Sequence, residues 1–212
     1  MPICRVAPRV ISGTMWRAMP RSTSDAGRGD SVFEDRLNHA SLLDAGLLSG
    51  ARFARYPYGD AAALAAHLAR AAGRRAIVLT DGVFSMDGDL APLPAIAAAC
   101  AGAAALLVVD DAHGLGAIGA TGRGSLEHFG LGATDVPLLI GTLGKAFGTF
   151  GAFAAGPAPL IELVLQRART CTYTTALPPA LAAASLAALD VIASEPWRRQ
   201  RLAANVARFR QR

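Results

Sequence analysis

The sequence predicts an α/β protein with a mostly parallel sheet and covering helices. From Ser31 onward, strand-like runs alternate with helix-like runs, which is the pattern of β-α-β units. Several of the strand-like runs are almost entirely apolar, as expected for strands that helices cover on both faces. Hydrophobic residues make up 52% of the 212 residues, which is enough for the core of one domain.

The first predicted elements are two helices and the strand between them. His39, in RLNHASLLDAG, lies beside a helix start, with Asn38 as a possible cap. A strand is expected over Ala51–Tyr56. Asp60 then has a side chain that can cap a helix running through Ala72.

The next predicted elements are two buried strands with a helix between them. Ala76–Thr80 and Ala105–Val109 are the expected strands, and Pro92 opens a helix through Ala101, since proline is favoured in a first helical turn. The uncharged run from Leu90 to Val109 is interpreted as this helix and strand, because two prolines and a glycine interrupt it. A membrane span is therefore not expected.

The last predicted elements are two more strands and three helices. Strands are expected over Pro137–Ile140 and Gly151–Ala155. Helices are expected after Pro157, from Pro178–Pro179 towards Ser194, and over Trp197–Arg212. No glycine, asparagine or proline ends the last helix, so we expect the chain to be a fragment of a longer protein.

Charge is distributed unevenly along the chain. Residues 1–29 have a net charge of +4 and residues 198–212 have +6, whereas residues 30–197 have −5. A nucleic-acid-binding face needs basic residues distributed over the fold, so no nucleic-acid partner is expected. Residues 1–30 show no periodicity and are expected to be disordered or non-native, with a transit peptide as the alternative.

The three cysteines argue against a disulfide framework. Cys4, Cys100 and Cys171 lie far apart and form no CxxC pair. Neither a disulfide framework nor a structural zinc site is expected, and a reducing compartment, the cytoplasm, fits this usage.

Lys145, in GTLGKAFGTFGA, is the only lysine, although the chain has 21 lysine and arginine residues. Arginine supplies positive charge but does not readily lose its proton. A lysine can become a neutral amine and attack a carbonyl carbon. Compositional bias can also remove lysines, so the count alone leaves both readings open.

The stretch VVDDAHGLG brings two acids and a histidine directly after a buried strand. Ligands of open α/β sheets bind at the carboxyl ends of strands, which makes Asp110 and His113 candidate site residues. The alternative is that Asp110 caps the following turn and His113 is a satisfied loop histidine. Adjacent carboxylates point to opposite sides, so Asp110 and Asp111 are expected to have different roles.

A second polar loop, TDGVFSMDGD, follows the strand that ends at Thr80. It contains Ser85 and the acids Asp81, Asp87 and Asp89. The spacing of a calcium-binding EF-hand and its last glutamate are missing, so no metal site is expected. Most of these acids are interpreted as turn formers.

Two glycine-rich stretches partly match the sequence motifs of phosphate-binding loops. GLGAIG fits G-x-G-x-x-G, but DDAH separates it from its strand and the turn-like ATGRG follows it. GTLGKA has two residues between its glycines where a P-loop needs four, and Ala146 replaces the magnesium-binding hydroxyl. The interpretation of GTLGKA as a P-loop is rejected, and a nucleotide-binding site at GLGAIG remains a weak alternative.

Five segments together resemble the α-oxoamine synthase family, whose members use pyridoxal 5'-phosphate (PLP) and have the aspartate-aminotransferase fold (fold type I). The resemblance covers about 180 residues from Ser31 onward, and it implies the large, cofactor-binding domain of that fold. The matching segments, in the order and approximate spacing of the family, are DRLNHASLLDAG, TDGVFSMDGDLAPL, VVDDAHGLGAIGATGRG, GTLGKAFGTFGAF and TYTTALPPA.

The resemblance implies that three residues hold the cofactor. Lys145 would attach PLP and move the substrate proton, which explains why this position keeps an amine. Asp110 would pair with the pyridine nitrogen and keep it protonated. Thr142, three residues before the lysine, would bind the phosphate.

Three further residues are implied beside the ring. His113 and Ser85 would bind the phenolic oxygen side, and His39 would stack on the ring face where the substrate binds. Either Thr174 or Thr175 resembles the residue that reaches the phosphate of a neighbouring subunit, since the family forms homodimers.

Within the family, the resemblance favours the enzymes that condense L-alanine with a pimeloyl thioester, of CoA or a carrier protein, with loss of carbon dioxide, in biotin biosynthesis. The wording of DDAHG and GKAFGTFGAF distinguishes this branch from glycine C-acetyltransferase and 5-aminolevulinate synthase. The alternatives are one of those branches, a truncated and non-catalytic remnant, or a nucleotide-binding domain built on GLGAIG.

The sequence also departs from the family. Members are nearly twice as long, and neither their phosphate-cradling glycine loop nor their small C-terminal domain with its carboxylate-binding arginine is found here. We therefore expect residues 31–196 to form part of the large domain. Residues 197–212 would begin a connecting helix towards the missing C-terminal domain.

Overall fold

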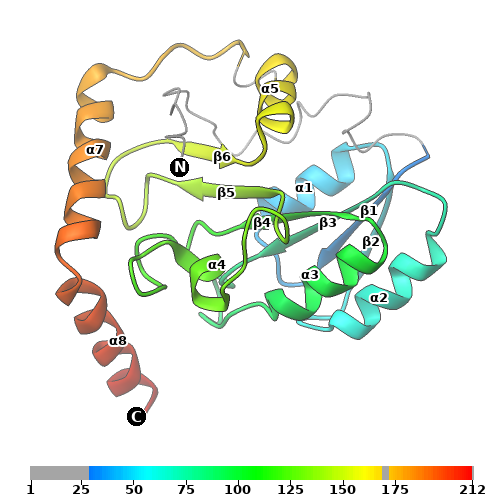
Figure 1. Cartoon of the computed structure of the whole chain (residues 1–212), viewed down its shortest axis with the longest axis horizontal. Helices are drawn as coiled ribbons and strands as arrows, with labels where there is room; N and C mark the ends of the chain where they lie inside the picture. The colour runs from blue at the N-terminus through cyan, green and yellow to red at the C-terminus, as the bar shows by residue number, and fades with distance from the viewer. Residues whose placement is uncertain (1–28, 169–171, 212) are drawn as a thin grey trace.

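A six-stranded sheet in the order β2-β1-β3-β4-β5-β6 forms the centre of the molecule (Figure 1). The computed structural model describes residues 29–168 and 172–211. All neighbouring strands are parallel except β5 and β6, which are antiparallel. The α/β prediction with a mostly parallel sheet is confirmed. The strands are β1 (Ser31–Asp35), β2 (Arg52–Tyr56), β3 (Ala76–Asp81), β4 (Leu106–Asp110), β5 (Leu138–Thr142) and β6 (Ala152–Ala155).

Four of the helices, α2, α3, α5 and α7, begin where the capping signals predict. The Asp60 carboxylate accepts a hydrogen bond from the Ala63 backbone N–H at 2.8 Å, as predicted for the cap of α2. Prolines occupy the first turns of α3, α5 and α7, where a missing N–H costs little. The helices are α1 (Ala40–Leu48), α2 (Ala61–Arg70), α3 (Leu93–Gly102), α4 (Gly124–Phe129), α5 (Ala158–Arg167), α7 (Pro179–Ser194) and α8 (Trp197–Arg210).

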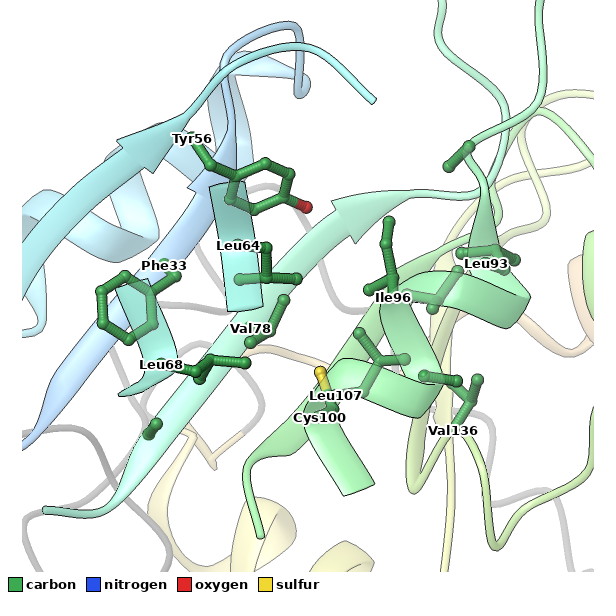
Figure 2. Close-up of a cluster of buried hydrophobic side chains, with 14 of the residues drawn as sticks. Phe33, Tyr56, Leu64, Leu68, Val78, Leu93, Ile96, Cys100, Leu107 and Val136 are labelled. Atoms are coloured by element: carbon green, nitrogen blue, oxygen red, sulfur yellow. The ribbon is translucent and has the colours of Figure 1, made fainter. Parts of the chain in front are cut away.

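Helices cover both faces of the sheet, because successive strand residues point to opposite faces. Val78 packs on the face covered by α2, α3 and α4, whereas its neighbours Ile77 and Leu79 pack on the face covered by α1 and α5. The same alternation separates Val109 from Val108 in β4. Figure 2 shows the first of these cores, where Leu64 and Leu68 of α2 meet Ile96 and Cys100 of α3 over the strands. The thiol of Cys100 is free and buried.

β1 is a strand that sequence reasoning did not predict. Its five residues, SVFED, are all buried, and it lies inside the sheet between β2 and β3. The apolar part is only two residues long and two acids follow, so the local pattern does not identify a strand. Glu34 is tolerated because the Arg55 guanidinium pairs with it at 3.1 Å.

Two smaller expectations were wrong or incomplete. His39, not Asn38, is the N-cap of α1, and the helix α4 after ATGRG was not predicted. Residues 1–30 are predicted to be disordered or non-native, and residues 1–28 of this segment lie outside the described residues. Asp30 is described, however, and it is buried and paired with Arg75 at 2.8 Å, so it belongs to the folded domain.

The two last helices extend along one edge of the structure (Figure 1). Neither contains a buried residue. A contact of 3.0 Å between the Thr149 and Ser185 hydroxyls connects α7 to the loop between β5 and β6, and Arg199 of α8 donates to the Ala120 carbonyl. In the described parts of the chain, no single helix is long and apolar enough to span a membrane. By length and composition alone, α7 and α8 together pass that test, with a bend of 73° between them.

Candidate active site

The candidate site lies at the carboxyl ends of β3, β4 and β5. Asp81 and Asp110 are direct partners in the parallel register of β3 and β4, and Asp110 is in turn the partner of Ile140 in β5. By strand alternation, both acids follow the face of Leu79 and Val108, which is the face that α1 covers. Two carboxylates therefore lie side by side at the carboxyl ends of these central strands, on the side of the sheet where α1 begins.

Lys145 reaches these strand ends from the loop that joins the antiparallel strands β5 and β6. The loop folds back on itself, because Gly148 N–H donates to the Lys145 carbonyl and Leu143 N–H donates to the Gly151 carbonyl. Gly148 adopts a φ of +63°, a conformation that residues with a Cβ rarely adopt. The Nζ atom of Lys145 lies 2.7 Å from Nε2 of His113.

The Lys145–His113 contact joins two residues that are 32 positions apart. Burial lowers the pKa of the His113 imidazole, and the Lys145 cation lowers it further, whereas Asp110 opposes this change. A neutral imidazole has one acceptor nitrogen, so the Lys145 ammonium can donate to it. The structure thus brings together two residues that the sequence singled out separately.

Asp110 is largely enclosed and has two histidines and Lys145 near its carboxylate. Burial raises the pKa of its carboxyl, and the Ala112 N–H, Lys145, His39 and His113 act in the opposite direction. The Ala112 N–H donates to Oδ1 at 3.0 Å, so Asp110 also closes the turn that follows β4. This bond bears out the alternative that Asp110 caps the turn, and its role in a ligand site stays a prediction.

Asp111 points to the opposite side of the sheet and has a different role, as predicted. It is fully buried, and its Oδ2 accepts a hydrogen bond from the Ser125 N–H of α4 at 2.8 Å. A Cβ on Gly82, Gly114 or Gly124 would come within 2.5 Å of its carboxylate, so three glycines allow the backbone to close around it. Asp111 therefore fastens α4 to the loops that leave β3 and β4.

His39 lies at the start of α1, beside the two strand-end acids. Its Nδ1 accepts from the Ser41 N–H at 3.3 Å and contacts the Ser41 hydroxyl at 2.8 Å. Its own backbone N–H donates to Oδ2 of Asp81 at 2.9 Å. The described contacts thus place His39, Asp110, His113 and Lys145 in one site.

Thr142 and Ser85 are less closely associated with Lys145, His113 and Asp110 than those three residues are with one another. The Thr142 hydroxyl donates to the Gly151 carbonyl at 3.0 Å and accepts from the Gly144 N–H at 3.2 Å, so it is engaged within the lysine loop. Ser85 is exposed in the loop after β3.

Asp81 is the site residue that sequence reasoning missed. It was interpreted as a turn former, but it is the last residue of β3 and only 3% exposed. Burial raises the pKa of its carboxyl to about 7, and Asp110 acts in the same direction. The signal was present in the sequence, since an acid that ends an apolar strand lies where ligands of parallel sheets bind.

No group of three or more histidine, cysteine or acidic side chains able to hold a metal ion occurs among residues 29–168 and 172–211.

Comparison with known proteins identifies the family. Residues 14–212 match the aminotransferase class I and II family. The chain is 65% identical over 185 residues to the 8-amino-7-oxononanoate synthase of Methylococcus capsulatus, which covers 87% of this chain and 48% of that protein.

Solved structures agree with this comparison. A serine palmitoyltransferase variant from S. paucimobilis, with bound PLP–myriocin aldimine, superposes with a TM-score of 0.84 at 30% identity over 93% of this chain and 49% of that one. The 8-amino-7-oxononanoate synthase of Francisella tularensis gives a TM-score of 0.77 at 30% identity, covering 92% of this chain and 55% of that one. The chain spans about half the length of the curated relatives it matches.

Proposed function

The chain belongs to the aminotransferase class I and II family, and from this premise we propose that it is a PLP-dependent acyltransferase. The proposed reaction condenses L-alanine with a pimeloyl thioester, of CoA or a carrier protein, with loss of carbon dioxide, to give 8-amino-7-oxononanoate. The observation that supports it most directly is the contact between Lys145 and His113 beside Asp110 at the sheet edge.

The chemistry of the side chains fits PLP. An amine is needed to attach its aldehyde carbon, and Lys145 is the only side-chain amine of the chain. A carboxylate is needed for its ring nitrogen, and Asp110 lies at the end of β4 in the field of Lys145. A Cβ on Gly148 would meet nothing within 4 Å, so the lysine loop has open space beside it.

The residues of the chain have distinct proposed roles. Asp110 would hold the ring nitrogen in its protonated form, and Thr142 would give its hydroxyl to the phosphate in place of its present bond to Gly151. His113 and Ser85 would bind the phenolic oxygen side, and His39 would lie against the ring and substrate. When bound, PLP withdraws electrons from the substrate Cα.

Lys145 would also move the substrate proton. Its Nζ lies within hydrogen-bonding distance of His113 Nε2, and a neutral His113 is able to accept a hydrogen bond from it. Burial and the lysine charge both keep His113 neutral. The imidazole therefore orients the amine within the site.

The substrate assignment is supported by the degree of similarity. The relative at 65% identity is named 8-amino-7-oxononanoate synthase, whereas the serine palmitoyltransferase is 30% identical. We also propose a homodimer in the cytoplasm. Exposed apolar side chains on α7 and α8, such as Leu186 and Phe209, are available for subunit contacts, and the free thiol of Cys100 fits a reducing compartment.

Trapping of the cofactor on the single lysine tests the proposal. Addition of PLP followed by borohydride makes a reversible carbonyl–amine linkage permanent, and peptide mapping then locates it. We expect the label on Lys145, and the Lys145→Ala variant should lose it while keeping the circular dichroism of the folded chain. The substituted variant has no lysine, so its remaining label reports only the N-terminal amine.

Label on the N-terminal amine alone in the unchanged chain would contradict the assignment of Lys145. The acyl acceptor and donor are tested separately, by formation of 8-amino-7-oxononanoate from L-alanine and pimeloyl-CoA. Product from glycine or serine in preference to alanine would move the chain to another branch of the family.

A further inference from the structure

We propose that Asp81 is a positioning residue of the active site, which together with Asn38 fastens the His39 segment to the carboxyl end of β3. The inference rests on the proposed function, in which His39 lies against the cofactor ring and the substrate. Asp81 would act through His39 and would not itself touch the reacting atoms.

Three hydrogen bonds make this connection. The Asn38 side chain donates from Nδ2 to the Leu79 carbonyl at 2.9 Å and accepts at Oδ1 from the Asp81 N–H at 3.0 Å. The Asp81 carboxylate completes it, because Oδ2 accepts from the His39 N–H at 2.9 Å. Asn38 thus binds the backbone of β3, and β3 binds the backbone of His39 through Asp81.

These bonds span a large separation in the chain. Asn38 and Asp81 are 43 residues apart, and so their contact depends on the parallel pairing of β1 with β3. The turn between β1 and α1 is also held at its start by β2, because the Arg36 N–H donates to the Tyr56 carbonyl at 3.1 Å. The bonds between Asn38, Asp81 and His39 hold the other end of this turn, where α1 begins, on β3.

The ring of His39 is fixed by a different set of contacts. The N-cap position sets its backbone at φ −55° and ψ 145°, and Ser41 binds Nδ1 through its N–H and contacts it through its hydroxyl. The Ser41 bonds orient the ring relative to α1, but they do not place α1 on the sheet. Asp81 supplies the second constraint, and both are needed to hold the ring at one place.

A buried carboxylate at position 81 is energetically unfavourable. This cost supports a specific role for the Asp81 carboxylate as the acceptor of the His39 N–H. Asp81 is only 3% exposed and lies beside Asp110, another carboxylate on the adjacent strand. Burial of a carboxylate next to a like charge is unfavourable unless hydrogen bonds compensate it. Removing the acceptor would leave the His39 N–H without the partner that it has in this structure.

Amide hydrogen exchange of the cofactor-free chain tests the contact. In Asp81→Ala, the His39 N–H should exchange about tenfold faster or more, the factor that corresponds to the loss of one hydrogen bond. Asn38→Ala should have a similar effect. Asp81→Asn keeps an acceptor oxygen and should stay within about threefold of the unchanged chain.

Two controls separate this effect from a loss of stability. Asp87→Ala removes an exposed acid from the same loop and should leave His39 exchange unchanged. The Val109 amide, in the buried strand β4, reports global opening and should keep its exchange rate in all variants at matched stability. Unchanged exchange of His39 in Asp81→Ala would overturn the proposal.

The visible circular dichroism of bound PLP, measured per mole bound, tests the consequence for the site. In Asp81→Ala, label should still reach Lys145, but the induced signal should fall at least about twofold, because a displaced His39 changes the surroundings of the ring. Asp81→Asn should restore it. If the induced signal falls as much in Asp81→Asn as in Asp81→Ala, the site depends on the negative charge of Asp81 and not on its acceptor oxygen. That result would overturn the positioning role.

The two experiments also separate this inference from the proposed function. If PLP does not attach to Lys145 in the unchanged chain, the proposed function fails, and the exchange measurement still decides whether Asp81 holds His39. If PLP attaches but its signal is the same in all variants, the proposed function stands and the positioning role is wrong.

Discussion

At the scale of single residues, the site depends on one amine and one imidazole that meet across the β4 and β5 loops. The Lys145 Nζ and His113 Nε2 atoms lie 2.7 Å apart. A cation at this distance disfavours a second positive charge, which adds to the effect of burial on His113. Lys145 therefore helps to keep His113 neutral before any ligand binds.

Removing the lysine charge should raise the pKa of His113. In Lys145→Met, the cation that lowers this pKa is lost, whereas Asp110, which raises it, remains. Lys145→Arg keeps a cation and should show a smaller change. The measurement is an NMR titration of the histidine ring signals, with the exposed His128 on α4 as the internal reference. A His113 titration that is identical in Lys145→Met and the unchanged chain would contradict the contact.

At the scale of elements, side-chain caps and buried acids determine where helices begin. Asp60 caps α2 through the Ala63 N–H, and Asp111 binds the Ser125 N–H in the first turn of α4. The first contact is local and was predicted, whereas the second joins residues 14 positions apart. Both satisfy N–H groups that a helix leaves unpaired at its start.

Loss of the Asp60 cap should destabilise the fold measurably. Asp60→Ala removes the acceptor at 2.8 Å from the Ala63 N–H and should lower the free energy of unfolding by about 1 kcal/mol. Urea denaturation followed by circular dichroism measures this change. Asp44→Ala, at an exposed position inside α1, is the matched control and should change stability by less than about 0.5 kcal/mol. Equal effects of the two substitutions would show that Asp60 does not act as a cap.

At the scale of the whole molecule, buried acids along the strand ends link stability to pH. Burial raises the pKa of Glu34 and Asp81 to about 7 and that of Asp111 to about 6. In the unfolded chain these groups have ordinary pKa values near 4. Between about pH 4 and pH 7 the folded chain therefore binds more protons than the unfolded chain does.

Stability should fall as pH rises through this window. The contribution of a raised carboxyl is present below its unfolded pKa and is lost as pH passes its folded pKa. We expect the free energy of unfolding to be at least about 2 kcal/mol lower at pH 8 than at pH 5, measured by urea denaturation. The lowered pKa of His113 acts in the opposite sense but involves one group.

Glu34→Gln provides the matched test of this link. Removing one of the buried acids should reduce the difference in stability between pH 5 and pH 8. Asp44→Ala, which removes an exposed acid, should leave that difference unchanged. A free energy of unfolding that rises from pH 5 to pH 8 in the unchanged chain would show that the buried acids do not dominate.

Local patterns of residues were sufficient to predict the class of fold, and they pointed to the candidate site residues. Five of the six strands follow from short strand-like runs, most of them apolar, and the starts of α2, α3, α5 and α7 follow from Asp60 and the prolines, because these signals are local. The choice of Lys145, Asp110 and His113 followed from residue type and position at strand ends. Reasoning of this kind is reliable for features that depend on residues close together in the sequence.

Contacts between distant parts of the chain set how these groups meet. β1, whose acids obscure a strand pattern in the sequence, lies inside the sheet through parallel pairing with β2 and β3, and Arg55 of β2 pairs with its Glu34. Asp81 lies in the site because the register of β3 and β4 sets it directly beside Asp110. The physical reason is the same in both cases: the environment of a buried acid is made by partners on other strands, and no local pattern of residues specifies those partners.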